Sequence, residues 1–105
     1  MRGDAASMRV LRPRTIREAM DADARHADAL SLAGGTDFMV AWNAGSENGR
    51  LILDLGAITP WRRVRESGDG LRLAALTTHW QLQHAPRVAK RFPLLTEACA
   101  TIGGW

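Results

Sequence analysis

Apolar residues in the first third of the chain are spaced as in a strand, a helix and a second strand. A short β-prone run covers residues 8–11, and Pro13 ends it. Thr15–Glu18 has the pattern of a capping box, in which the threonine hydroxyl accepts a helix N–H and the glutamate reaches back. A helix follows to about Ala24, and its apolar face comprises Ile16, Ala19 and Met20. The run Leu30–Ala33 then reads as a strand, which predicts a parallel β-α-β unit.

The middle of the chain continues this alternation of helix and strand. Phe38–Trp42 is predicted to be a short helix, with Thr36 or Asp37 as its N-cap. Residues 43–49 contain two glycines and two asparagines and read as a loop. Leu51–Leu55 is almost continuously apolar, as expected of a strand that is covered on both faces.

Strong turn chemistry marks a hairpin in the second half of the chain. Residues 62–66 and 71–75 are predicted strands on either side of Ser67–Gly70. Leucine and arginine alternate in the second of these strands, which predicts one face exposed to water. Thr78–Gln81 then repeats the capping-box pattern and predicts the start of a short helix.

Two prolines divide the remaining helical segment. Pro86 interrupts the helix, and residues 87–91 form a further turn. Pro93 suits the first position of a last helix, and Gly103 is placed to cap its end. The apolar stripe of this helix is predicted to consist of Leu94, Leu95, Ala98, Cys99 and Ile102.

Taken together, the elements predict an α+β protein: a small parallel β-α-β sheet followed by a β-hairpin and helices. Residues 1–8 precede the first periodic segment, and we expect them to be a flexible N-terminus. The sequence stops at Trp105 directly after the last predicted cap, with no closing strand. We therefore expect the chain to be a fragment of a longer domain.

Composition narrows the classes of function. The 105 residues are 46% hydrophobic, which is typical of a globular domain. Residues 1–7 lack the apolar core of a signal peptide, and no apolar run approaches the ~20 residues of a membrane span. These features predict a cytoplasmic protein without a membrane partner.

Charge leaves a second function class open. The net charge is +3, and only Arg62–Arg63 and Arg65 cluster among the scattered arginines. No interleaved aromatics accompany them, so we do not expect a nucleic-acid partner. A basic module that binds anions or nucleic acid remains an alternative.

Residues that could carry catalysis or bind a metal are few and scattered. The single cysteine, Cys99, excludes an internal disulfide or a multi-cysteine metal site, and its place in an apolar stripe predicts a core residue. His79 and His84 are five residues apart, off a shared helical face, so we expect surface or capping histidines and no metal site. Asp54 interrupts an apolar strand and is predicted to hydrogen-bond nearby main chain. No acid–base pair or catalytic triad is present, and no catalytic residue is assigned.

The segment Leu32–Asp37 is the strongest candidate for a binding site. A glycine pair follows a predicted strand, where the backbone can approach a ligand closely. The amides at the start of the next helix attract anions, so this loop suits a phosphate group. The segment is neither a G-x-G-x-x-G fingerprint nor a Walker A loop, since no lysine follows its glycines. A plain strand-to-helix turn, in a structural protein without a flavin, is the alternative.

Five short motifs resemble, in order, the FAD-binding subunit or domain of the molybdenum hydroxylases, the xanthine dehydrogenase and carbon monoxide dehydrogenase type. The loop Leu32–Asp37 is similar to the family's A-G-G-[TH]-[DS] motif, and Ala74 stands where a later motif usually has glycine. The matching segments are Arg12–Pro13 with Ile16 and Glu18–Ala19, Leu32–Asp37, Ile52–Leu55, Leu73–Thr78, and Phe92–Leu95 with Glu97–Ala98 and Ile102–Gly103.

The resemblance implies an N-terminal portion of a PCMH-type FAD-binding fold over residues 9–105. It also implies that the first of two loops that hold the FAD pyrophosphate is formed by Leu32, Ala33, Gly34, Gly35, Thr36 and Asp37. Thr101–Gly104 looks like the second glycine loop but follows the proline-led helix too directly, so we interpret it as the helix end. The second loop and the C-terminal domain are then missing, and Ile102 is implied to pack near the flavin.

The same resemblance implies a role in electron transfer. In such enzymes, substrate is oxidised at a molybdopterin centre in a large subunit. Electrons then cross the [2Fe–2S] clusters of a small subunit to FAD and pass to NAD⁺ or another acceptor. The chain is therefore expected to be the FAD-binding component, inactive alone, with those two subunits as its partners.

Overall fold

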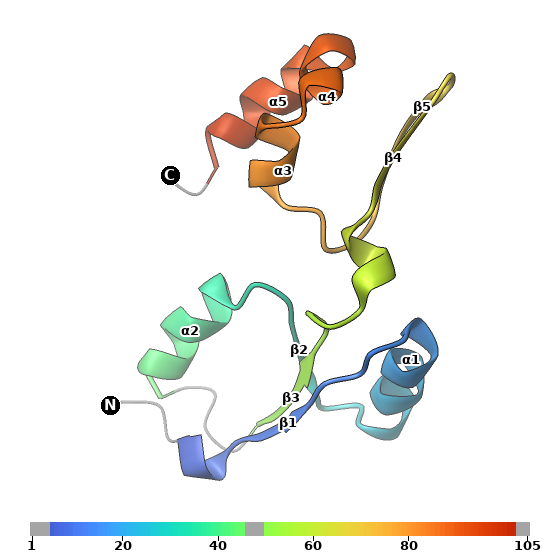
Figure 1. Ribbon diagram of the computed structural model, residues 1–105. Coiled ribbons are helices and arrows are strands. Elements are labelled where there is room, and N and C mark those ends of the chain that lie inside the picture. Colours follow the sequence, from blue (N-terminus) through green and yellow to red (C-terminus); the bar gives the residue numbers. More distant parts are fainter. Residues whose placement is uncertain (1–4, 46–49, 103–105) are drawn as a thin grey trace. The chain divides into compact units, whose positions relative to one another are not determined.

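The computed structural model describes residues 5–45 and 50–102, and Figure 1 shows their helices and strands. The chain forms two compact units, residues 1–59 and residues 60–105. Predictions that fall on Gly103 and on residues 1–4 and 46–49 lie outside the described residues.

The first unit contains a three-stranded parallel sheet with the strand order β1-β3-β2. A one-turn helix, η1, precedes the sheet within the segment that was expected to be flexible. Helices connect consecutive strands, so the predicted parallel β-α-β unit is confirmed. The elements are η1 (Ala5–Ser7), β1 (Arg9–Leu11), α1 (Ile16–Arg25), β2 (Leu30–Leu32), α2 (Thr36–Asn43) and β3 (Leu51–Asp54).

The core of the first unit is centred on β3. This strand pairs with β1 on one side and with β2 on the other, and Leu51, Ile52 and Leu53 are all buried. Its continuous apolar run follows from this position, because a central parallel strand is covered on both faces. Ala19 of α1 and Ile58 are also buried in this unit.

Helix α1 begins at the predicted cap but buries less than its pattern suggests. The Thr15 hydroxyl accepts the Glu18 N–H at 3.1 Å, as expected. The Glu18 carboxylate accepts the Arg14 N–H, one residue before the predicted donor. Of the predicted apolar face only Ala19 is buried, whereas Ile16 and Met20 are exposed. Helix α1 therefore contacts β3 along a narrow strip, and a sheet of three short strands offers no wider surface.

The second unit combines an antiparallel hairpin with three short helices. The hairpin and the capping box at the start of α3 were both predicted, and both are confirmed. The Thr78 hydroxyl accepts the Gln81 N–H at 3.1 Å, and the Gln81 side chain accepts the Thr78 N–H at 2.9 Å. The elements are η2 (Thr59–Arg62), β4 (Val64–Ser67), β5 (Gly70–Leu73), α3 (His79–Gln83), α4 (Pro86–Arg91) and α5 (Pro93–Ala100).

The core of the second unit is a cluster of Leu82, Val88 and Cys99. Cys99 is therefore a core residue, as predicted. The stripe predicted for α5 is only partly correct, because Leu94 is 78% exposed and Ile102 is 49% exposed. Helix α5 packs against α3 and α4, and the exposure of Leu94 and Ile102 places them at the outer edge of this contact. Partly buried residues that pack against the cluster are Val64, Leu71, Ala85, Phe92 and Leu95.

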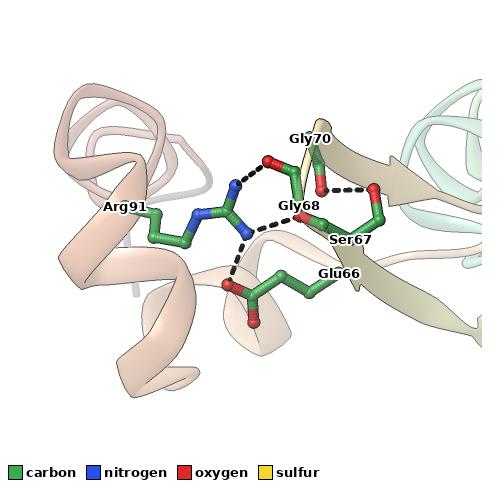
Figure 2. A network of polar contacts seen from close by, with 5 residues as sticks. All are labelled: Glu66, Ser67, Gly68, Gly70 and Arg91. Carbon is green, nitrogen blue, oxygen red and sulfur yellow. Dashed lines mark hydrogen bonds and ion pairs between the residues drawn. The ribbon is translucent and has the colours of Figure 1, made fainter.

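A single arginine joins the helical part of the second unit to the hairpin turn (Figure 2). Arg91, the last residue of α4, donates to the Glu66 carboxylate at 2.9 Å and to the Ser67 carbonyl at 2.7 Å. Its second terminal nitrogen donates to the Gly68 carbonyl at 3.3 Å. The planar guanidinium therefore satisfies three acceptors at once, a geometry that the point charge of lysine does not reproduce.

We expect Arg91→Lys to destabilise the chain by about 1 kcal/mol, because the fork of hydrogen bonds is lost while the charge remains. Lys90→Ala is the matched control, since Lys90 lies in the same last turn of α4 and makes none of these contacts. Urea denaturation monitored by circular dichroism measures both variants. Equal midpoints for Arg91→Lys and the parent chain would contradict the proposed stabilisation.

Candidate functional site

The glycine loop lies at the carboxyl-terminal edge of the parallel sheet. Strand β2 ends at Leu32, which is in register with Asp54, the last residue of β3. The Leu55 N–H donates to the Leu32 carbonyl at 2.8 Å and so fixes the end of β2. Ala33, Gly34 and Gly35 then lead directly into α2. Ligands of open parallel sheets bind outside this edge, so the loop is placed where a ligand is expected.

The two glycines differ in what they allow. Gly35 has φ +81°, in the left-handed region, and is the N-cap of α2. The prediction of Thr36 or Asp37 as N-cap is therefore wrong, because the chain turns one residue earlier at a position that favours glycine. A Cβ at Gly34 would meet no atom within 4 Å, so the loop is open on that side.

Backbone N–H groups are available around these glycines. The first hydrogen bond of α2 joins the Met39 N–H to the Gly35 carbonyl at 2.9 Å, and the amides before Met39 lie in the unpaired first turn. Within the described residues, neither Gly34 nor Gly35 donates its N–H to another group. Gly35 has no side chain that could cap the helix. The loop therefore offers unpaired amides and open space, and these residues fit a diphosphate.

The side chains of Thr36 and Asp37 lie outside the described part of the structure. Their expected roles, a hydroxyl donor and a brace for the loop, stay predictions. Ile102 follows α5 in the second unit, and its expected contact with a flavin also stays a prediction. The backbone amides of Thr36 and Asp37 join the first turn of α2, which the sequence analysis did not foresee because it placed the helix start at Phe38. The signal for the earlier start was the glycine pair.

Asp54 has a structural role at the same sheet edge. Its carboxylate accepts the Gly56 N–H at 2.9 Å, as predicted, and Arg12 lies 3.4 Å away as an ion-pair partner. The arginine was not foreseen, because the two residues meet only when β1 and β3 are adjacent. Asp54 is thus held by groups of its own unit and shapes the turn after β3.

The histidines cap helices or lie on the surface. His26 is the C-cap of α1, and His84 is the C-cap of α3. The Nδ1 atom of His84 is 2.8 Å from the Trp80 carbonyl, and the two rings stack with centroids 4.2 Å apart. Across the described ranges, no three metal-ligating side chains gather into a possible site.

Among the described residues, no helix has the length and apolar character needed to span a membrane.

Comparisons with known proteins agree with this geometry. The family described as "FAD binding domain in molybdopterin dehydrogenase" matches residues 6–105. The chain is 31% identical over 94 residues to a putative xanthine dehydrogenase FAD-binding subunit of Escherichia coli, covering 89% of this chain and 32% of the relative. It is 27% identical over 92 residues to the nicotine 6-hydroxylase medium subunit of Paenarthrobacter nicotinovorans, covering 88% and 32%.

Solved structures of carbon monoxide dehydrogenases contain a chain with a similar fold. A carbon monoxide dehydrogenase from Hydrogenophaga pseudoflava matches with a TM-score of 0.80 at 28% identity, over 88% of this chain and 32% of that chain. A reconstituted CO dehydrogenase from Oligotropha carboxidovorans shares the fold with a TM-score of 0.82 at 24% identity, over 95% and 34%. The chain spans about a third of the length of the curated relatives that it matches. It belongs to the family of FAD-binding domains in molybdopterin dehydrogenases.

Proposed function

We propose that the loop Ala33–Gly35 and the start of α2 hold the pyrophosphate of FAD. The observation that carries the proposal is a pair of glycine amides that donate to no group among the described residues, beside open space at the carboxyl-terminal edge of the sheet. Amide N–H groups at a helix start are donors of the right polarity for a diphosphate, and the helix dipole adds to the attraction.

Each residue of the loop has a distinct part in this proposal. Gly34 and Gly35 offer their N–H groups, and Leu32 and Ala33 bring the chain to the edge of the sheet. Thr36 adds a hydroxyl donor, while the anionic Asp37 turns away from the phosphates and braces the loop. Ile102 supplies apolar contact to the flavin.

In the wider assembly, the chain is proposed to be the N-terminal portion, residues 9–105, of an electron-transfer subunit. FAD, once bound, would supply the redox chemistry, the transfer of electrons from [2Fe–2S] clusters to NAD⁺ or another acceptor. A molybdopterin-binding large subunit and a [2Fe–2S] small subunit are the proposed partners, in the cytoplasm. Relatives named as medium subunits or chains of such dehydrogenases support this assignment.

Titration of the 105-residue chain with FAD tests the pyrophosphate site directly. We expect weak binding, since the family's second loop is not among the proposed contacts. At about ten times the dissociation constant, FAD should stabilise the chain by about 1.4 kcal/mol and raise the melting temperature by several degrees. Riboflavin, which lacks the diphosphate, is the matched ligand and should have no comparable effect. An equal shift with riboflavin, or none with millimolar FAD, would contradict the proposal.

A further inference from the structure

A second possible binding surface lies on the hairpin, in the other unit of the chain. A cavity of about 240 Å³ opens there, beside the antiparallel pair β4 and β5. Its lining residues are three arginines and three apolar residues, with no aspartate or glutamate among them. The lining residues are Pro60, Arg63, Arg65, Arg72, Leu73 and Ala74.

Strand register explains why the three arginines gather. Arg65 is the direct cross-strand partner of Arg72, so both side chains leave the same face of the hairpin. The Ala74 N–H donates to the Arg63 carbonyl at 3.1 Å, which extends the pairing by one step. Arg63 lies two residues before Arg65, and side chains two apart on a strand share a face.

Repulsion among these three arginines destabilises the hairpin unless negative charges offset it. Like charges directly opposite each other on a sheet are destabilising. Arg63, Arg65 and Arg72 make no side-chain hydrogen bond or ion pair within the described residues, and all three are exposed. By contrast, Arg91 in the same unit is fully engaged with Glu66 and the turn carbonyls.

The opposite face of the hairpin already has its partner. Val64 and Leu71 project to that face and pack against the core cluster of Leu82, Val88 and Cys99. The arginine face therefore takes no part in this core cluster.

We propose that this arginine face, formed by Arg63, Arg65 and Arg72, docks an acidic segment of a partner protein in extended conformation. Carboxylates two residues apart on an extended chain repeat every ~6.6 Å, the interval expected between Arg65 on β4 and Arg63, which directly precedes β4 and pairs with Ala74. Guanidinium groups bind carboxylates bidentately and are enriched in protein interfaces. Pro60 and Ala74 line the same cavity and suit the apolar atoms of a peptide better than a bare inorganic anion.

The residues that line the cavity favour an acidic peptide over a nucleic acid. Sequence-tolerant binding of single strands relies on aromatic rings that stack on bases. The cavity lining contains no aromatic residue. An oligonucleotide therefore serves as a competing probe in the test.

The test uses the full 105-residue chain and a fluorescein-labelled ten-residue peptide with glutamate at alternate positions and serine between. Fluorescence anisotropy should show binding that weakens with added salt, and the peptide with glutamine in place of glutamate should not bind. Arg65→Gln with Arg72→Gln should weaken binding about tenfold or more, because two charge-assisted contacts are lost.

Matched variants distinguish binding at this arginine face from a general effect of the net positive charge. Arg87→Gln with Lys90→Gln removes the same charge from α4 of the same unit, outside the cavity lining, and should change binding less than twofold. Arg72→Glu places opposite charges across the strands, so it should raise the melting temperature while abolishing binding.

Three results would overturn the docking proposal. The first is absence of binding by the glutamate peptide, and the second is equal loss of binding in the α4 control variant. The third is tighter binding of a single-stranded oligonucleotide of the same charge that is lost in the Arg65 and Arg72 variant. Variants at Gly34 should bind the peptide normally, so this outcome is independent of the flavin site.

Discussion

Gly34→Val is expected to weaken FAD binding at least ~10-fold and to leave the stability of the chain almost unchanged. The fold tolerates this change because a Cβ at Gly34 meets no atom within 4 Å. A branched side chain then fills the open space through which a diphosphate reaches the Gly34 and Gly35 amides. Isothermal titration with FAD and thermal melting, measured on the same samples, separate the two effects.

Gly35→Val should lower both the FAD affinity and the stability of the chain. At φ +81° a residue with a Cβ is strained by about 1–2 kcal/mol, whereas its Cβ would make only an ordinary van der Waals contact with Leu32 Cδ1 at 3.6 Å. The strain shifts the start of α2 and disperses its first-turn amides. In a longer subunit that contains this chain, either valine is expected to abolish retention of flavin through purification.

Gly68→Val is the matched control for these two variants. Gly68 lies in the hairpin turn, has open surroundings like Gly34, and is not among the positive-φ glycines of the described residues. Its substitution should leave FAD affinity unchanged. If Gly34→Val bound FAD as tightly as the parent chain, the loop would be a plain strand-to-helix turn and the pyrophosphate assignment would be wrong.

The sequence predicted the elements around this loop because their signals are local. A continuous apolar run can only be satisfied at a central position in a sheet, and Leu51–Leu53 are buried there. Capping patterns involve residues three apart, so the start of α3 after its N-cap Thr78 followed from the local sequence alone. The candidate loop was located for the same reason, since glycines after a strand mark a close approach of backbone to ligand.

Features that depend on the backbone conformation of a turn or on contacts between distant residues were not predicted. Thr36 and Asp37 are intrinsically better N-caps than glycine, and only the left-handed turn at Gly35 reverses that order. Leu94 and Ile102 fit the apolar stripe of a helix, but the helix sequence alone does not show how much of that stripe the neighbouring elements cover. The Arg12–Asp54 pair and the alignment of Arg65 with Arg72 likewise require the strand pairing to be known.

Ile52→Ala should cost about 3 kcal/mol of unfolding free energy, a large effect because its side chain is one of the two largest that are fully buried among the described residues. Ile52 is 1% exposed at the centre of β3, between β1 and β2. Removing three carbon atoms there leaves a cavity that short, hydrogen-bonded strands cannot close. A small domain has only about 5–15 kcal/mol of total stability, so urea denaturation should show a marked fall in midpoint.

Val10→Ala is the matched control for Ile52→Ala, because Val10 is the register partner of Ile52 on β1 but is 56% exposed. We expect a loss below ~1 kcal/mol, which reflects strand propensity without a core cavity. Similar costs for the two variants would contradict the assignment of β3 as the buried centre. These two variants also test the glycine loop, because β3 pairs with β2, the strand that ends just before Gly34. Loss of FAD binding by Ile52→Ala should therefore be recovered when an excluded osmolyte restores folding, whereas the loss caused by Gly34→Val should persist.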